Sequence, residues 1–270
     1  MDMNDIAARG LVLLGCGKMG SALLEGWLHQ GLPATSVHVL EPRPSDWLGA
    51  TGVHLNGPLP SAPAVALLAV KPQMMGEALP ALRALGGGGT LFVSIAAGTS
   101  LASLEAALGT GTPVVRVMPN TPAAVGRGIS ALIGNPLVSP AELALAESLM
   151  AAVGQTVMLE HEGQMDAVTA VSGSGPAYVF HLIEALAAAG EAEGLPAAMA
   201  MQLARATVCG AGELARQSPE SAAQLRINVT SPGGTTAAAL GVLMAEDSGF
   251  PPLLRRAVKA AADRSRELGR

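Results

Sequence analysis

The chain has 270 residues and a formal net charge of −5, and 50% of its residues are hydrophobic, 14% charged and only 2% aromatic. A chain of this length can bury a sizeable core in one or two domains. The scattered basic residues and the scarcity of aromatic side chains argue against a nucleic-acid partner, which needs clustered cations and stacking surfaces.

The mean hydropathy of +0.41 raises the question of a membrane protein. The uncharged runs 47–70 and 84–104 are interrupted by glycines, prolines and polar residues, so neither offers the roughly 20 continuous apolar residues of a spanning helix. The acidic start MDMNDIAARG lacks the apolar region of a secretory signal. Cys16 and Cys209 form no disulfide framework, and the histidines never take metal-ligand spacing. We expect a cytoplasmic protein with no metal site and no membrane association.

The N-terminal region contains a glycine-rich turn between a strand and a helix. Leu11–Leu14 is wholly apolar, as expected of a buried parallel strand, and GCGKMG follows at 15–20. A helix is expected over 21–29 and a second strand over 37–40, which Glu41 closes. A strand, a glycine turn, a helix and an acid about 20 residues later match the dinucleotide fingerprint.

Each glycine of this turn has its own role. Gly15 allows the tight turn, Gly17 lets a pyrophosphate approach the backbone, and Gly20 lets the helix pack on the strand. The helix N-terminus offers unpaired N–H groups to the phosphates. We assign cofactor binding to these glycines together with Lys18 and Met19.

Two charged residues after the second strand give opposite indications about the cofactor. Glu41 stands where an acid accepts the ribose 2′-hydroxyl of NAD. Arg43 stands where a guanidinium could clamp the 2′-phosphate of NADP. Both could also be solvated loop charges, so the choice between NADP and NAD stays open.

Strands and helices then alternate. Further strands are expected over 65–70, 90–95, 114–117 and 155–159, with helices over 74–85 and 101–108 and a capped helix from Ser139. This alternation predicts an α/β fold with a Rossmann-type parallel sheet over residues 1–161.

The remaining residues, 162–270, predict an all-α domain. Helices are expected over 166–190, interrupted at 172–176, and over 196–215, 235–245 and 251–268. Glu162 and Asp166 share a helix face at a four-residue spacing; they could be solvated charges, ribose or substrate contacts, or acids favoured at a helix start.

Several segments follow strand ends, where an open α/β sheet binds ligands. They are 70–72, 95–98 and 118–122, and the small Ala96 and Ala97 would let a nicotinamide ring lie against the backbone. The segment Ser231–Thr236, SPGGTT, stands at the expected start of a helix and offers backbone N–H groups and hydroxyls there. Such a helix N-terminus suits a carboxylate. The alternative for this segment is a helix cap followed by close packing. No lysine lies between Lys71 and Lys259, so a lysine base in the helical domain has no candidate.

Together these motifs resemble one enzyme family. The segments GCGKMGSA, AVKPQ, SIAAGTS, RVMPNTPAAVGRG, DAVTAVSGSGPAYVF and VTSPGGTT occur in the order found in pyrroline-5-carboxylate reductases. The resemblance implies reduction of L-1-pyrroline-5-carboxylate to L-proline with NADP or NAD, the last step of proline biosynthesis. A β-hydroxyacid dehydrogenase-like enzyme would need the missing lysine, and a nucleotide sensor without activity would not need SPGGTT.

The resemblance also implies roles for individual residues. The Thr236 hydroxyl would hydrogen-bond the ring nitrogen, and Gly234 and Thr235 would seat the carboxylate. The wider substrate set adds Ser231 and Glu162, and the cofactor set adds Asn56, Ala69, Val70, Lys71, Pro72, Ile95, Ala96, Ala97 and Asn228.

The resemblance further implies a homodimer through the helical domain and a decamer of such dimers. Two features depart from the family pattern. Where many relatives carry His-Pro before the leucine that precedes the substrate loop, residues 220–225 read ESAAQL. Where they carry Lys-Asp after that leucine, this chain has Arg226 and Ile227.

Overall fold

The computed structural model describes residues 3–269. Residues 1 and 2 of the first predicted domain and residue 270 of the second lie outside the described residues. The contacts divide the described chain into two compact units. Residues up to 173, together with those from 262 onward, form the sheet unit, and residues 174–261 form the helical unit.

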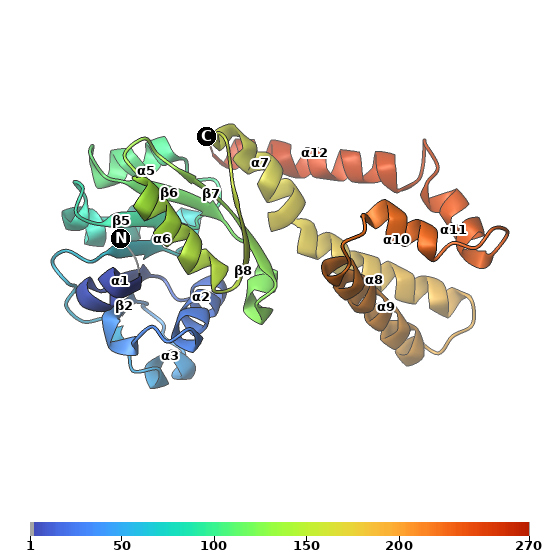
Figure 1. Ribbon diagram of the computed structural model, residues 1–270, viewed down its shortest axis with the longest axis horizontal. Coiled ribbons are helices and arrows are strands. Elements are labelled where there is room, and N and C mark those ends of the chain that lie inside the picture. The colour runs from blue at the N-terminus through green and yellow to red at the C-terminus, as the bar shows by residue number, and fades with distance from the viewer. Residues whose placement is uncertain (1–2, 270) are drawn as a thin grey trace. The chain divides into compact units, whose positions relative to one another are not determined.

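The sheet unit is built on eight strands (Figure 1). They are β1 (Leu11–Leu14), β2 (Val37–Leu40), β3 (His54–Leu55), β4 (Val65–Leu68), β5 (Leu91–Ser94), β6 (Val114–Met118), β7 (Gly128–Gly134) and β8 (Gly154–Met158). The strand order is β3-β2-β1-β4-β5-β6-β7-β8: β2 and β3 are added on one side of β1, and β4 and the later strands on the other, so the order of the strands reverses between β1 and β4. That switch point is where open α/β sheets bind their ligands.

One pairing departs from the predicted parallel sheet. β6 and β7 are antiparallel, with Val117 opposite Leu132, while the other neighbouring pairs are parallel. The connection between them is the short 3-10 helix Thr121–Val125. A parallel return would need a longer crossover, whereas an antiparallel return does not. Local sequence patterns did not predict β7, the two-residue β3 or the helix α1 (Met3–Arg9).

Helices cover both faces of this sheet. On one face, α2 (Lys18–His29) and α6 (Pro140–Ala151) pack with α1 and α3 (Asp46–Ala50) against alternate strand residues such as Leu11 and Leu13 (Figure 1). On the other face, α4 (Met75–Ala78), a 3-10 helix over Leu79–Leu85 and α5 (Leu101–Leu108) pack against Val12 and Leu14. The residues of β1 are buried on both faces, which explains its uninterrupted apolar run.

Local signals set several element boundaries. The predicted capping box at Ser139 is confirmed: its side chain accepts from the Glu142 N–H, and Glu142 accepts from the Ser139 N–H. The single helix expected over 74–85 is instead α4 followed by the 3-10 helix, in which Pro80 stands near the start. Proline at that position donates no backbone N–H, so the α-helical bonding pattern does not continue through it.

The sheet unit extends beyond its last strand. A 3-10 helix (Glu162–Gln164), α7 (Met165–Val168) and a π-helical turn (Thr169–Gly173) follow β8. The last strand therefore ends close to residue 161, the predicted end of the sheet domain. The contacts nevertheless assign residues 162–173 to the sheet unit. The glycine-containing interruption expected at 172–176 coincides with the end of this π-helical turn.

The helical unit contains α8 (Gly175–Ala192), α9 (Ala197–Gln217), α10 (Ala222–Asn228), α11 (Thr235–Leu243) and most of α12 (Phe250–Leu268). Its buried hydrophobic residues are the alanines Ala187, Ala200 and Ala204, whereas Phe180 is 60% exposed. Small side chains bury little apolar area, so this unit has no large core of its own. Among residues 3–269, no helix is long and apolar enough to cross a bilayer.

Candidate dinucleotide site and substrate loop

The glycine turn after β1 has the geometry of a dinucleotide cradle. Gly15 has a φ of +88°, and a Cβ there would lie 2.9 Å from Val70 Cγ1. A Cβ at Gly20 would lie 2.6 Å from the Gly15 carbonyl oxygen. A Cβ at Gly17 would meet no heavy atom within 4 Å, so space is open at the position where the fingerprint places the pyrophosphate.

This turn leads directly into α2. Gly17 is the N-cap and offers no side chain to the first helical N–H groups, which are left for a ligand. Lys18 is exposed and Met19 is half-buried at the start of the helix. These residues therefore fit a dinucleotide, and the cofactor roles given to them remain predictions.

Glu41 is anchored to this turn by its carboxylate. One oxygen accepts the Cys16 N–H at 2.8 Å, and the other accepts the Arg43 N–H at 3.0 Å. Asn56 holds the backbone of the same residue: Asn56 Oδ1 accepts the Glu41 N–H, and Asn56 Nδ2 donates to the Glu41 carbonyl, each at 2.9 Å. Asn56 itself has a φ of +52°, a conformation that asparagine tolerates better than most residues. The structure thus brings the predicted Glu41 and Asn56 to the glycine turn.

Electrostatics at the turn follow from this arrangement. Burial, and secondarily the negative charge of Glu41, raise the pKa of the Cys16 thiol to about 11. The thiol is therefore protonated at neutral pH and does not act as a nucleophile. The side chain of Arg43 is exposed.

The predicted strand-end residues line the switch point. The Ala69 N–H donates to the Leu14 carbonyl at 2.8 Å, and the Ile95 N–H donates to the Leu68 carbonyl at 3.0 Å. These bonds place the segments after β1, β4 and β5 side by side. The predicted residues on these segments are Ala69, Val70, Lys71, Pro72, Ile95, Ala96 and Ala97.

Glu162 takes part in a network that the sequence analysis did not predict. Its Oε1 accepts from Arg116 Nη1 at 2.6 Å and from the Leu101 N–H, at the start of α5, at 2.9 Å. Arg116 is buried in the otherwise apolar β6, while the Glu162 side chain is 31% exposed. A charged residue inside an apolar strand was the available signal, because buried arginine needs a partner. Asp166 instead accepts from the Ser265 hydroxyl at 2.6 Å.

Asn120 joins the loop after β6 to the π-helical turn. Its Nδ2 donates to the Ser172 hydroxyl at 3.2 Å and to the Ser172 carbonyl at 3.3 Å. Its Oδ1 accepts the Ile129 N–H at 2.9 Å. One amide thus fixes the MPNTP and SGSGP segments against each other, a role that the sequence analysis left unassigned.

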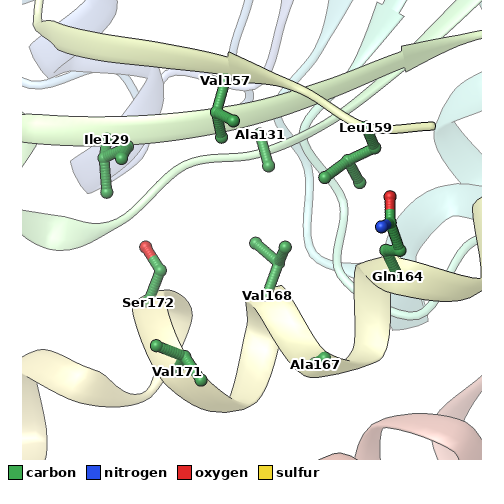
Figure 2. A pocket seen from close by; sticks show the side chains of 9 residues that line it. All are labelled: Ile129, Ala131, Val157, Leu159, Gln164, Ala167, Val168, Val171 and Ser172. Carbon is green, nitrogen blue, oxygen red and sulfur yellow. The ribbon is translucent and has the colours of Figure 1, made fainter.

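An apolar pocket of about 360 Å³ lies beside that turn, between the strands β7 and β8 and the segment 164–172 (Figure 2). Its lining residues are Ile129, Ala131, Val157, Leu159, Gln164, Ala167, Val168, Val171 and Ser172. None of the residues predicted to bind substrate or cofactor lines this pocket. Without cationic side chains in its wall, it does not suit a pyrophosphate.

The substrate-loop residues lie in the helical unit. Gly233 has a φ of +69°, and the Gly234 N–H donates to the Ser231 carbonyl at 3.0 Å. Gly234 is the N-cap of α11 and supplies no side-chain acceptor. The first N–H groups of α11, from Thr235 onward, are therefore not capped by a side chain, and the anion site predicted there stays a prediction.

Asn228, predicted to reach the cofactor, is engaged locally. Its Oδ1 accepts from Gln224 Nε2 at 2.8 Å, and its Nδ2 donates to Glu220 Oε2 at 2.9 Å. Ser221 caps α10 through the Gln224 N–H. The segment ESAAQL (220–225) differs from the family pattern, and its residues Glu220 and Gln224 hold Asn228 just before the substrate loop.

Two family models match the chain. One, described as pyrroline-5-carboxylate reductase dimerisation, matches residues 162–268. The other, described as NADP oxidoreductase coenzyme F420-dependent, matches residues 10–98.

Similar proteins match over three quarters or more of the chain. The pyrroline-5-carboxylate reductase of Pseudomonas aeruginosa is 42% identical over 96% of both chains. That of Synechocystis is 48% identical over 76% of this chain and 75% of its own. A solved Coxiella burnetii pyrroline-5-carboxylate reductase superposes with a TM-score of 0.90 at 34% identity, covering 97% of this chain and 99% of its own. The Plasmodium falciparum enzyme, solved with NADP bound, gives a TM-score of 0.81 at 30% identity, covering 97% and 98%.

The sheet with its glycine turn and the helical unit define an NAD(P)-dependent oxidoreductase of the Rossmann type. The similarity to curated enzymes extends through both units. The chain belongs to the pyrroline-5-carboxylate reductase family.

The Arg116–Glu162 network makes a prediction about stability. Arg116→Met should lower the free energy of unfolding by about 3 kcal/mol, because it leaves the Glu162 carboxylate without its cation. Urea denaturation at one protein concentration measures this. Arg83→Met, at an exposed arginine, should cost less than about 0.5 kcal/mol. Equal losses in the two variants would contradict the prediction, and Glu162→Gln added to Arg116→Met should recover part of the loss.

Proposed function

We propose that the protein reduces the C=N bond of L-1-pyrroline-5-carboxylate to give L-proline, with NAD(P)H as the hydride donor, as the final step of proline biosynthesis. The observation that carries this proposal is 42% identity to a pyrroline-5-carboxylate reductase along 96% of both chains. The free cysteines Cys16 and Cys209 support a reducing compartment, the cytoplasm, as its place of work.

The sheet unit would hold the cofactor. When bound, the nicotinamide cofactor supplies the hydride that is added to the imine carbon. The N–H groups of the turn at 15–20 would bind the pyrophosphate, with Lys18 and Met19 beside it. The strand-end segments, including Ala96 and Ala97, would bind the nicotinamide half; Ala97 is exposed, whereas the Ala96 side chain is buried in the core.

The helical unit would hold the substrate. The carboxylate would lie at Gly234 and Thr235, where the N–H groups of α11 from Thr235 onward and the hydroxyl of Ser231 would receive it and the helix dipole favours an anion. The Gly234 N–H donates to the Ser231 carbonyl and keeps this turn in shape. The Thr236 hydroxyl would hydrogen-bond the ring nitrogen, which gains a proton as the imine carbon gains hydride. A neutral hydroxyl is a weak acid, so Thr236 would orient the ring or relay a proton from water.

Glu162 would complete the ligand contacts. Within residues 3–269, both hydrogen bonds of its carboxylate are made to Oε1, so Oε2 would be available to a ligand hydroxyl or N–H. Arg116 and the Leu101 N–H would keep this carboxylate in place. Asn228 would contact the cofactor, and its hydrogen bonds with Gln224 and Glu220 would hold its side chain in place.

The assay that tests the function follows NAD(P)H absorbance with purified protein. Oxidation should depend on added L-1-pyrroline-5-carboxylate and should yield L-proline in equal amount. A β-hydroxyacid should give no reduction of NAD(P)⁺, because the helical region offers no lysine before Lys259. Absence of turnover with the imine would overturn the proposal and favour a nucleotide-binding protein without activity.

Thr236 provides a sharper test of the site. Thr236→Val keeps the shape and removes the hydroxyl, so kcat/KM should fall about tenfold, which corresponds to one lost hydrogen bond of about 1.4 kcal/mol. Thr236→Ser should retain most of the activity. Cofactor dissociation constants and thermal unfolding serve as folding controls. A rate in Thr236→Val equal to that of the unchanged protein would remove the role given to the hydroxyl.

We further propose that the helical unit forms a homodimer, with a decamer of such dimers as the larger assembly. The dimerisation family model covers this unit. Large apolar side chains such as Phe180, Leu203 and Val242 are more than half exposed in the single chain, and a second copy would bury them. Obligate homodimer interfaces are rich in such large apolar side chains and resemble a domain core cut in half.

Charge placed in that surface should prevent association. Leu203→Glu should give a monomer in light scattering coupled to size-exclusion chromatography, because burying an unpaired carboxylate is costly. Leu137→Glu is a matched control, since Leu137 and Leu203 are both 51% exposed and Leu137 lies in the sheet unit. An unchanged mass for Leu203→Glu would contradict the proposed interface, and the mass of the unchanged protein separates dimer from decamer.

A further inference from the structure

We infer that this protein selects NADH over NADPH, and that Glu41 is the residue that sets the selection. The inference rests on the proposed reductase function only in that the protein uses a nicotinamide dinucleotide. It concerns residues of the sheet unit alone, at the turn between β1 and α2 and at the end of β2.

Glu41 is a fixed anion rather than a mobile surface charge. Two backbone N–H groups, those of Cys16 and Arg43, hold its two carboxylate oxygens at 2.8 and 3.0 Å. Asn56 holds its backbone N–H and carbonyl through both ends of one side-chain amide. Each carboxylate oxygen has further lone pairs, so it can still accept the hydroxyls of an adenosine ribose.

A 2′-phosphate would be placed beside this anion. At the end of the second strand an acid meets the 2′-position of the ribose, and a phosphate monoester adds about −1.5 to −2 charges at neutral pH. The field of Glu41 already extends to Cys16: after burial, it is the second cause that raises the pKa of that thiol to about 11. The same field opposes a further negative charge at this place.

Arg43 is the competing group, and its position is weaker. Its backbone N–H is bonded to Glu41. Its guanidinium is exposed, and among residues 3–269 it has no ion pair or hydrogen bond that would hold it toward the turn. Clamping a phosphate with Arg43 would require ordering a flexible side chain next to a carboxylate that repels the phosphate. The fixed acid therefore outweighs the mobile base.

Direct binding tests the inference without substrate. Titration of the intact protein with NADH and NADPH, followed by nucleotide fluorescence, should give a dissociation constant at least tenfold lower for NADH. Glu41→Gln keeps an oxygen acceptor and removes the charge, so the ratio should fall below threefold, mainly through tighter NADPH binding. Arg43→Ala is the matched control and should leave the ratio unchanged. Equal or tighter NADPH binding by the unchanged protein, or an unaltered ratio in Glu41→Gln, would overturn the inference.

Salt dependence gives a second measurement that needs no variant. Screening weakens repulsion between Glu41 and a 2′-phosphate, so raising the salt from about 0.02 to 0.5 M should increase NADPH affinity relative to NADH. An Arg43 clamp would give the opposite sign, because screening weakens attraction, and that result would overturn the inference.

These outcomes are independent of the imine assay. Protein that prefers NADH but does not reduce L-1-pyrroline-5-carboxylate would refute only the proposed function. Protein that reduces the imine but binds NADPH more tightly would refute only the role of Glu41.

Discussion

The close packing of the turn between β1 and α2 is the constraint on which the cofactor half of this protein depends. Gly15 adopts a positive φ against Val70, and Gly20 lies on the Gly15 carbonyl oxygen. A side chain at either position would push the turn away from the sheet. Because the turn is held there, the Gly15 N–H bonds to the Leu40 carbonyl, and Glu41 at the end of β2 reaches the Cys16 N–H. One packing contact thereby brings the N-terminus of α2 and the carboxylate of Glu41 together.

The helical unit, in contrast to the closely packed turn of the sheet unit, has few large side chains buried within it. Its buried hydrophobic residues are alanines, while its larger apolar side chains are exposed. The apolar area that it buries alone is small relative to the conformational entropy lost on ordering long helices. Association of two copies would supply the missing burial, so the stability of this unit and the assembly of the protein are coupled.

Most of the sheet could be predicted from local patterns. The strand over 11–14, the helix over 101–108 and the capping box at Ser139 are confirmed because each depends on neighbouring residues. β7 was missed because GISALIG has glycine at both ends and returns antiparallel, which the repeated strand–helix pattern does not indicate. Glu162 was placed among the ligand residues, but its link to Arg116 joins positions 46 residues apart, and no spacing rule reports such contacts.

The sequence by itself determined the class of fold, the glycine turn, the glycine-containing segment before α11 and the family resemblance, because these depend on short segments with fixed backbone requirements. Only the tertiary structure decided what the side chains between segments do. It gave Glu41 two N–H donors from different segments, tied Asn120 to Ser172, and left the helical unit without a large core. Such contacts depend on which segments meet in space, and that is fixed by packing of the whole chain rather than by local periodicity.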